Sequence, residues 1–272
     1  MNKSLFSHAS LVFSVLALGA FADVTNTRWV STSPQITELL FQLGKERFLV
    51  GTSDQSFYPE KARAIPKIGL LFHPNLESIF AQKPMGVFWD ASSENAVMKD
   101  HLALLGIKSV SLELNSVRGI FQSIKIIQRE LADSKLSEEF RKSEEIWSSS
   151  VNKQKSFSFL ALAWADPPIL FGKNTFLFNL IQEMGGKGIL PKNWKTSYPK
   201  VSEEWIITQR PEVLIFLNHD ENTYRIFKNK CEMWWPKDSP RCTGISAEKF
   251  ARASLTPILY LPDLRRALGV TP

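Results

Sequence analysis

The sequence has few of the residues from which catalytic and metal centres are usually built. It contains only two cysteines and four histidines, and His73, His101 and His219 lie far apart along the chain. It has no nucleophile elbow, phosphate-binding loop, dinucleotide fingerprint or His-x-x-x-His pair. A secreted enzyme with dispersed catalytic groups stays open as an alternative. The sequence favours a binding protein that is not an enzyme and that holds no metal and no cofactor of its own.

Clustered charge and long apolar runs are also absent. The formal net charge is +6, but Lys and Arg are spread along the chain without interleaved aromatics, so nucleic acid is not an expected partner. No run of eighteen apolar residues occurs, so no membrane-spanning helix is expected. The apolar stretch 11–18 follows Lys3 and precedes Ala20-Phe-Ala22, the pattern of a cleavable secretory signal. Residues 1–22 are predicted to be a signal peptide without a lipid anchor, and the mature chain is expected to be a periplasmic monomer.

The two cysteines are Cys231 and Cys242. An oxidising compartment makes a disulfide between them the default, with free thiols as the alternative. A zinc site is disfavoured because no histidine is near in sequence. Closing so short a loop is expected to stabilise the fold by roughly 2 to 3 kcal/mol in the chain-entropy description of the unfolded state.

The most informative feature that is present is a repeat. Residues 75–89, NLESIFAQKPMGVFW, and residues 202–216, SEEWIITQRPEVLIF, read almost alike. In each copy an N-capping residue, Asn75 or Ser202, precedes a short helix. A basic residue and a proline end that helix, and an apolar run follows as a buried strand. The repeat indicates a chain built of two similar lobes.

Each copy of the repeat carries a glutamate at the same place, Glu77 and Glu204. Both fall in the first turn of their predicted helix, where a carboxylate complements the helix dipole. That role is common on any helix and requires no partner. Two matching acids on two similar lobes are also what a partner in contact with both lobes would recognise.

Strand and helix signals alternate on either side of a segment that has only helical periodicity. This pattern predicts an N-terminal α/β lobe at 23–115, a helical connector at 116–154 and a C-terminal α/β lobe at 155–272. The periodicity of the connector breaks near Asp133, and its second half is polar nearly all round, as in helices that bridge lobes. The expected fold class is therefore α/β, with two Rossmann-like lobes of parallel sheet joined by a long backbone helix. A ligand cleft is expected between the lobes, at the ends of the strands.

The loops expected to border that cleft are rich in aromatic side chains. Such residues lie beside Pro, Asp and Gly, whereas core aromatics belong to helix stripes and strand faces. For any one of them, ordinary loop packing is the alternative. Together they indicate a wide, flat and partly apolar ligand, since aromatic faces offer large contact areas. They are Phe57, Tyr58, Phe72, Trp89, Trp164, Trp194 and Tyr198.

A charged pair, Glu248 and Arg252, precedes the last predicted helix. A solvated surface pair is the simplest interpretation. An arginine directed into the cleft would instead donate hydrogen bonds to amide or carboxylate groups of a ligand.

With these motifs in place, the chain resembles the helical-backbone class of ABC-importer substrate-binding proteins. The resemblance rests on the signal pattern, the SPQITEL helix start at 33–39, Tyr58-Pro59, the repeat, and FARAS at 250–254. Within that class the chain is most similar to the cobalamin-binding members, over nearly all of its mature length. The resemblance implies a non-enzymatic protein that captures cobalamin or a related corrinoid and delivers it to ABC permease subunits in the inner membrane.

The resemblance also assigns ligand contacts. Tyr58, Trp89 and Tyr198 correspond to the aromatic contacts of the family, and Tyr198 stands where a tryptophan is usual. Arg252 corresponds to its cleft arginine, with Glu248 in place of the usual aspartate. A further family tryptophan falls near residues 71–72, where this chain has Leu and Phe.

For the partner, the resemblance implies that Glu77 and Glu204 each pair with an arginine of one permease subunit. These are the positions that the repeat selects. The segment with Cys231 and Cys242 is unlike the family's usual pattern.

Two alternative ligands remain within the same class. Related haem-binding proteins use a tyrosine from the loop corresponding to Tyr58 as an iron ligand, and iron-siderophore binders share the scaffold. The sequence does not decide between these ligands and a corrinoid.

Overall fold

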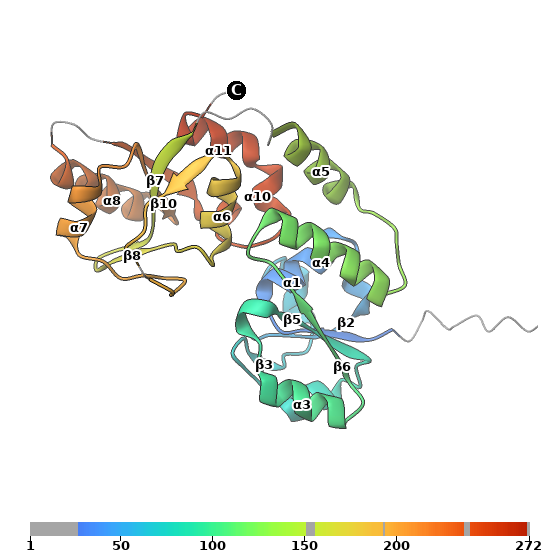
Figure 1. The fold of residues 1–272 in the computed structure, drawn as a ribbon. Coiled ribbons are helices and arrows are strands. Elements are labelled where there is room, and N and C mark those ends of the chain that lie inside the picture. The colour runs from blue at the N-terminus through green and yellow to red at the C-terminus, as the bar shows by residue number, and fades with distance from the viewer. Residues whose placement is uncertain (1–26, 151–155, 193, 237–239, 271–272) are drawn as a thin grey trace, which may run out of the picture.

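The computed structural model describes residues 27–150, 156–192, 194–236 and 240–270. These residues form two α/β lobes joined by a helical segment (Figure 1). The predicted signal peptide lies outside the described residues. No helix in the described part of the chain is long and apolar enough to cross a membrane.

The N-terminal lobe is built on a four-stranded parallel sheet in the order β2-β1-β5-β6. Its strands are β1 (Trp29–Ser31), β2 (Leu49–Thr52), β5 (Gly86–Asp90) and β6 (Lys108–Leu112). A small antiparallel pair, β3 (Gly69–Leu70) and β4 (His73–Pro74), lies beside it. Its helices are α1 (Pro34–Gln42), α2 (Leu76–Ala81) and α3 (Ala96–Leu104), with short 3-10 turns at Glu46–Phe48, Glu60–Ala64 and Ala91–Ser93.

The C-terminal lobe has a parallel sheet in the order β9-β7-β10-β11, to which β8 adds an antiparallel strand beside the end of β7. Its strands are β7 (Phe157–Ala165), β8 (Pro168–Leu170), β9 (Gly186–Gly188), β10 (Val213–Asn218) and β11 (Arg241–Ser246). Its helices are α6 (Phe176–Glu183), α7 (Glu203–Gln209), α8 (Glu221–Trp234), α9 (Ala247–Phe250), α10 (Thr256–Leu259) and α11 (Leu261–Leu268). The predicted parallel sheets are confirmed, and β8 is the exception.

The two lobes share one topology. The order β2-β1-β5-β6 matches β9-β7-β10-β11, and each neighbouring pair in both runs is parallel. The repeat predicted from the sequence is α2 followed by β5 in one lobe and α7 followed by β10 in the other.

The repeat extends to the backbone and side chains of the two short helices. The N-cap side chains of Asn75 and Ser202 both accept a hydrogen bond from the backbone N–H three residues on. Ile79 and Ile206, at equivalent positions, are both fully buried. The basic residue before each proline is in the left-handed region, with φ of 49° at Lys83 and 42° at Arg210. The two copies therefore have the same local fold, and not merely similar sequences.

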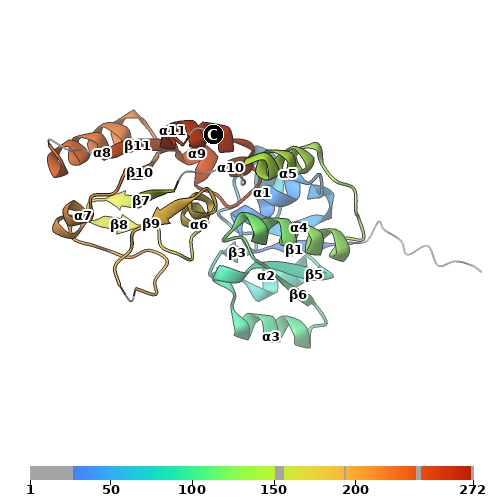
Figure 2. The ribbon, with the colours of Figure 1, turned by 45° about the horizontal axis from the view of Figure 1, so that its top comes forward.

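Two helices form the connector between the lobes. Helix α4 (Val117–Glu130) contributes Ile120, Ile124 and Ile127 to the largest core cluster, and α5 (Glu138–Ser150) packs against α10 and α11 of the C-terminal lobe (Figure 2). The break expected near Asp133 is confirmed, so the connector is not one continuous helix. Asp133 is held there by salt bridges to Lys45 and Arg47, both at 2.5 Å.

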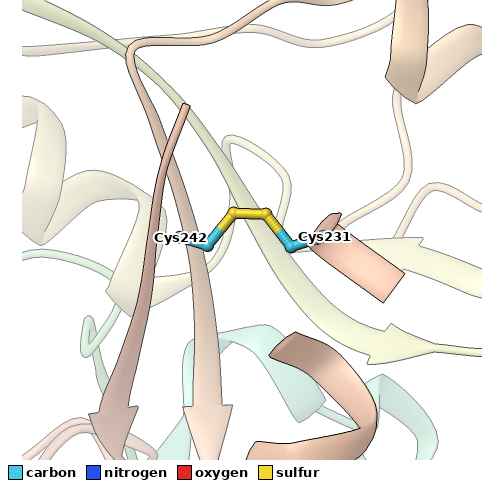
Figure 3. Close-up of a disulfide and its surroundings, with 2 residues drawn as sticks. All are labelled: Cys231 and Cys242. Atoms are coloured by element: carbon cyan, nitrogen blue, oxygen red, sulfur yellow. A yellow bond between two sulfur atoms is a disulfide. The ribbon is translucent and has the colours of Figure 1, made fainter. Parts of the chain in front are cut away.

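The predicted disulfide joins α8 to β11 (Figure 3). The Cα atoms of Cys231 and Cys242 are 6.5 Å apart, within the range that a disulfide spans. The bond ties a helix on one face of the C-terminal sheet to the edge strand of that sheet.

Candidate functional site

The aromatic ring of Tyr58 and the guanidinium of Arg252 meet where the two lobes adjoin. Tyr58 belongs to the loop before the 3-10 turn at 60–64, and Arg252 follows α9. The guanidinium carbon lies 4.6 Å from the centroid of the tyrosine ring, a cation–π contact. The tyrosine side chain stays 49% exposed. The predicted site residues from opposite ends of the chain are thus brought together with an accessible aromatic face.

Arg252 is not a solvated surface arginine. Its Nε donates to the carboxylate of Glu38, which is only 1% exposed on α1. Its Nη2 donates to the backbone carbonyl of Glu248 at 3.3 Å. The remaining nitrogen, Nη1, has no hydrogen bond among the contacts of the described residues, and 27% of the side chain is exposed. Arg252 can therefore still donate to a bound molecule.

Glu248 lies on α9 with an exposed side chain. Its contact with Arg252 is made by the backbone carbonyl and not by the carboxylate. The salt-bridge partner of Arg252 is instead Glu38 of the other lobe. No sequence pattern marked Glu38 as a site residue, although it belongs to the SPQITEL helix start.

Tyr198 of the C-terminal lobe lies close to an acid of the N-terminal lobe. Partial burial raises the pKa of the Tyr198 phenol, and the negative charge of Asp90 raises it further. The Tyr198 ring packs 5.9 Å from the ring of Phe171, centroid to centroid, and remains half exposed. The Asp90 carboxylate also accepts hydrogen bonds from the backbone and hydroxyl of Ser92. Tyr198 of one lobe thus interacts electrostatically with Asp90 of the other.

The structure does not support the prediction that Trp89 contacts a ligand. The side chain has no exposed surface and packs in a core cluster with Val30, Ile79 and Leu102. Its indole N–H has no hydrogen-bond partner among the residues that the structure describes. All five residues of β5 are buried, because this strand is covered on both faces of the sheet. Its neighbour Asp90, at the end of the strand, lines a surface pocket instead.

The other aromatic residues predicted to lie in loops are exposed. Exposed aromatic side chains are available to contact a ligand or a partner. The exposed fractions are 56% for Phe57, 60% for Phe72, 62% for Trp164 and 46% for Trp194.

A pocket of about 580 Å³ opens at the carboxyl ends of β7 and β10. Its lining is mostly apolar, and His219 and Thr223 supply polar groups. Helix α8 closes one side through Ile226 and Phe227, and Trp164 closes another. The position between β7 and β10 is where the strand order reverses, the usual ligand site of such sheets. Sequence analysis singled out Trp164 but not this pocket, because α8 was not predicted.

A smaller pocket of about 180 Å³ lies at the equivalent edge of the N-terminal sheet. Asp90 and Glu113 are its acidic lining residues. In the described part of the chain, no three His, Cys, Asp or Glu side chains are grouped so as to hold a metal ion.

The paired glutamates of the repeat, Glu77 and Glu204, are both exposed. Hydrogen bonds from its own backbone N–H and from Ser202 lower the pKa of the Glu204 carboxyl, which is fully solvent-accessible. The adjacent Glu203 differs, because it accepts hydrogen bonds from Lys230 at 2.6 Å and from the indole of Trp234 at 3.0 Å. Of the two acids that begin α7, Glu203 is thus held by hydrogen bonds within the lobe. The carboxylate of Glu204 is exposed and can contact a partner.

An exposed apolar side chain follows each of these glutamates by three residues. Phe80 is 55% exposed and Ile207 is 37% exposed. Residues three apart on a helix lie on one face. Each lobe therefore presents a carboxylate and an apolar side chain at equivalent places.

Comparison with known proteins places these features in context. Residues 30–228 match the family described as periplasmic binding protein. This range includes the N-terminal lobe from the second residue of β1 onward, the connector, and the C-terminal lobe into α8.

Several curated relatives are similar over most of their length. The vitamin B12-binding protein of Vibrio campbellii is 28% identical over 224 residues, covering 80% of this chain and 79% of the relative. The vitamin B12-binding protein of Yersinia pestis (strain Pestoides F) is 26% identical over 274 residues, with 97% and 93% covered.

Solved structures share the fold. The periplasmic vitamin B12 binding protein of Vibrio cholerae has a TM-score of 0.70 at 17% identity, covering 89% of this chain and 96% of that chain. The periplasmic heme binding protein of the same organism has a TM-score of 0.69, also at 17% identity, with 89% and 98% covered. Similarity at this identity supports the two-lobed fold and does not choose a ligand.

Proposed function

Because this chain belongs to the family of periplasmic binding proteins, we propose that it captures a corrinoid, cobalamin first among them, in the periplasm. We further propose that it delivers this ligand to an ABC importer in the inner membrane. The observation that carries the ligand proposal is the contact of Tyr58 and Arg252 across the lobes. The vitamin B12-binding relatives, which match 80% and 97% of the chain, favour a corrinoid over other ligands of the class.

In the proposed complex, the exposed rings of Tyr58 and Tyr198 pack on the faces and edges of the corrin. Aromatic side chains give large contact areas to such flat ligands at low entropic cost. The free Nη1 of Arg252 donates to peripheral amide carbonyls, which a corrin carries in number. Trp89 makes no direct contact in this proposal, since it is buried.

The pocket beside Trp164 extends the proposed site into the C-terminal lobe. Its volume of about 580 Å³ suits part of a large ligand rather than the whole of it. We assign it to an apolar portion of the corrinoid. We also assign Glu248 to the rim of the site. Its exposed carboxylate would accept hydrogen bonds from amide N–H groups of the ligand.

Haem is the second candidate, and one observation favours it. Tyr58 presents an accessible phenol beside a guanidinium, which is a suitable environment for an anionic oxygen ligand to ferric iron. Structures with this fold include haem-binding proteins. Iron-siderophore binding is the remaining alternative of the same class.

Titration of the purified mature protein with cyanocobalamin, haemin and a ferric siderophore separates these candidates. We expect saturable binding of cyanocobalamin at a ratio of one ligand to one protein. A Soret band that appears with haemin and shifts on Tyr58→Phe would transfer the assignment to haem. Binding of neither tetrapyrrole would refute both assignments.

For delivery, we propose that Glu77 and Glu204 each pair with an arginine of one permease subunit. Two separated charge pairs fix orientation better than one. This proposal is supported by the exposure of both side chains at equivalent places in the repeat. It is also supported by the different role of Glu203, whose carboxylate is occupied by Lys230 and Trp234.

A further inference from the structure

Buried Glu38 is the centre of a hydrogen-bond network between the lobes. It lies on α1 of the N-terminal lobe, and its side chain is 1% exposed. Its Oε1 accepts hydrogen bonds from the hydroxyls of Ser254 at 2.8 Å and Thr256 at 3.0 Å. Its Oε2 accepts from Nε of Arg252. Each of these three donors belongs to the C-terminal lobe, more than two hundred residues further along the chain.

A neighbouring side chain on α1 completes the network. Gln42 donates through Nε2 to the Thr256 hydroxyl at 2.8 Å and accepts from the Leu255 backbone N–H at 2.9 Å. The segment from Arg252 to Thr256 is thus fixed to one face of α1 by side chains one helical turn apart. A buried carboxylate is stable only when paired and hydrogen-bonded, and here the pairing cation is Arg252.

The geometry determines which parts of Arg252 remain accessible. The carboxylate of Glu38 occupies its Nε edge, and the Glu248 carbonyl occupies Nη2. The guanidinium carbon lies over the Tyr58 ring, 4.6 Å from its centroid. Among the contacts of the described residues, Nη1 is left without a hydrogen bond, and the side chain as a whole is 27% exposed. A guanidinium is planar and rigid, so fixing one edge fixes the direction of the opposite nitrogen.

We propose that Glu38 is a positioning residue for the ligand site, which orients Arg252 against Tyr58 and so couples the contact between the lobes to ligand affinity. It acts through Arg252 and does not touch the ligand. This inference rests on the proposed function only for the identity of the ligand. The placement of Arg252 by Glu38 stands apart from that identity.

The test compares Glu38→Gln with a matched interlobe variant. Glutamine keeps the size of the side chain and an acceptor for the hydroxyls, but removes the charge that holds Arg252. The matched control is Asn179→Ala, which removes another interlobe hydrogen bond, from Asn179 Nδ2 to the Asn115 carbonyl at 2.7 Å. Neither partner of that bond contacts Arg252 in the described contacts. Circular dichroism and thermal melting confirm that each variant is folded.

Binding of cyanocobalamin is measured by calorimetry for the wild type, Glu38→Gln, Arg252→Ala, the double variant and Asn179→Ala. We expect Glu38→Gln to weaken binding about tenfold or more, as loss of a charge-assisted contact does. Arg252→Ala should weaken it similarly, and the double variant should be no weaker than Arg252→Ala alone. Asn179→Ala should bind within about twofold of the wild type. Equal losses in Glu38→Gln and Asn179→Ala, or additive losses in the double variant, would overturn the proposal.

A second measurement needs no ligand. The Nε–Hε resonance of Arg252 in an NMR spectrum reports both its hydrogen bond and the ring current of Tyr58. It should be displaced in the wild type and in Asn179→Ala, and return towards the free-arginine position in Glu38→Gln. An unchanged resonance in Glu38→Gln would refute the positioning role even if cyanocobalamin binds. If the wild type binds no cyanocobalamin while the resonance behaves as expected, the ligand assignment fails and the positioning role stands.

Discussion

At the scale of single residues, the aromatic side chains predicted to contact the ligand differ in their exposure to solvent. Tyr58 and Tyr198 are about half exposed, whereas Trp89 is fully buried. Substituting these residues should therefore affect different quantities. We expect Tyr58→Ala to weaken binding of the proposed corrinoid by on the order of 2 kcal/mol, as the loss of an aromatic hot spot does, with little change in melting temperature. Fluorescence or calorimetric titration measures the first quantity and thermal melting the second. Wild-type affinity in both Tyr58→Ala and Tyr198→Ala would contradict the site.

Trp89 gives the opposite prediction. Removing a large side chain from a close-packed core leaves a cavity, and we expect Trp89→Ala to lower the free energy of unfolding by about 3 to 5 kcal/mol. Urea denaturation measures this directly. Trp164→Ala is the matched control, because that indole is 62% exposed and its loss should hardly change stability. Equal destabilisation by the two substitutions would show that the burial of Trp89 contributes nothing.

The burial of Trp89 could not be read from the sequence, for a physical reason. A strand covered on both faces has no polar and apolar alternation, and the sequence GVFWD gives no sign of which side chain points along the sheet edge. The exposure of Tyr58 and Tyr198 was predictable, because loop residues beside proline differ from a core pattern. Their contact with a ligand, and that of Arg252, stays a prediction. Glu38 was not predictable, because its partners come from the other end of the chain.

At the scale of elements, the break between the two connector helices is held by the salt bridges of one acid, Asp133. Burial on its own raises the pKa of Asp133, but the hydrogen bond and charge of Lys45, the backbone N–H of Lys135 and the charge of Arg47 outweigh it, so the net pKa is lowered. A lowered folded-state pKa gives stability that is present above the unfolded-state value and lost as pH falls through the folded-state value.

We therefore expect Asp133→Asn to lower the melting temperature at pH 7, where the wild-type carboxylate is charged. The difference from the wild type should shrink as the pH falls below about 4, the unfolded pKa of an aspartate, and it should vanish once the folded-state carboxyl is protonated. Thermal melts of both proteins at a series of pH values measure this difference in melting temperature. A difference that persists unchanged in strong acid would show that charge is not its cause.

The docking acids also belong to the scale of elements. Charge reversal at both positions, Glu77→Lys with Glu204→Lys, should leave ligand affinity and melting temperature nearly unchanged, since both side chains are exposed. Delivery to the importer in reconstituted vesicles should be lost, because each proposed pairing with an arginine becomes a repulsion. The control is Glu203→Gln, which should cost stability through Lys230 and Trp234 but still deliver. Normal transport by the double variant would show that the two glutamates do not dock the permease and only complement the dipoles of their helices.

Most elements could be predicted, and each exception has its own cause. The repeat, the alternation of strands and helices and the break near Asp133 follow from capping residues and apolar periodicity. Helix α8 was missed because only Phe227, Cys231 and Trp234 are buried along its length, and the cysteines suggested a loop closed by a disulfide. The sequence predicted one last helix, but the structure has two, α10 and α11. Tyr260 lies between them, and Pro262 is at the start of the second.

At the scale of the whole molecule, the two lobes are joined by more than a linker. The largest core cluster contains residues of both lobes and of α4, and the network around Glu38 joins α1 to the segment before α10. Wide closure would break these contacts. We expect the ligand-free and ligand-bound forms to differ by a modest rotation.

Small-angle X-ray scattering with and without the bound corrinoid checks this expectation. The radius of gyration should change little on saturation. Glu38→Gln provides a useful comparison, because weakening the network should widen the distribution of lobe orientations. A large compaction of the wild type on ligand addition would contradict the rigid arrangement.

The repeated helix start in α2 and α7 has a consequence for the encounter with the proposed permease. The two helix starts each present an acid and an apolar side chain. A half-turn that exchanged the lobes would therefore exchange two similar docking points. A two-subunit partner with its own two-fold axis would accept the carrier in either of two orientations, and both bring the ligand to the same translocation path. Twice as many collisions are then productive, which relaxes the orientational constraint on association. The remaining differences between the halves, such as Phe80 against Ile207, would show up as unequal occupancy of the two orientations.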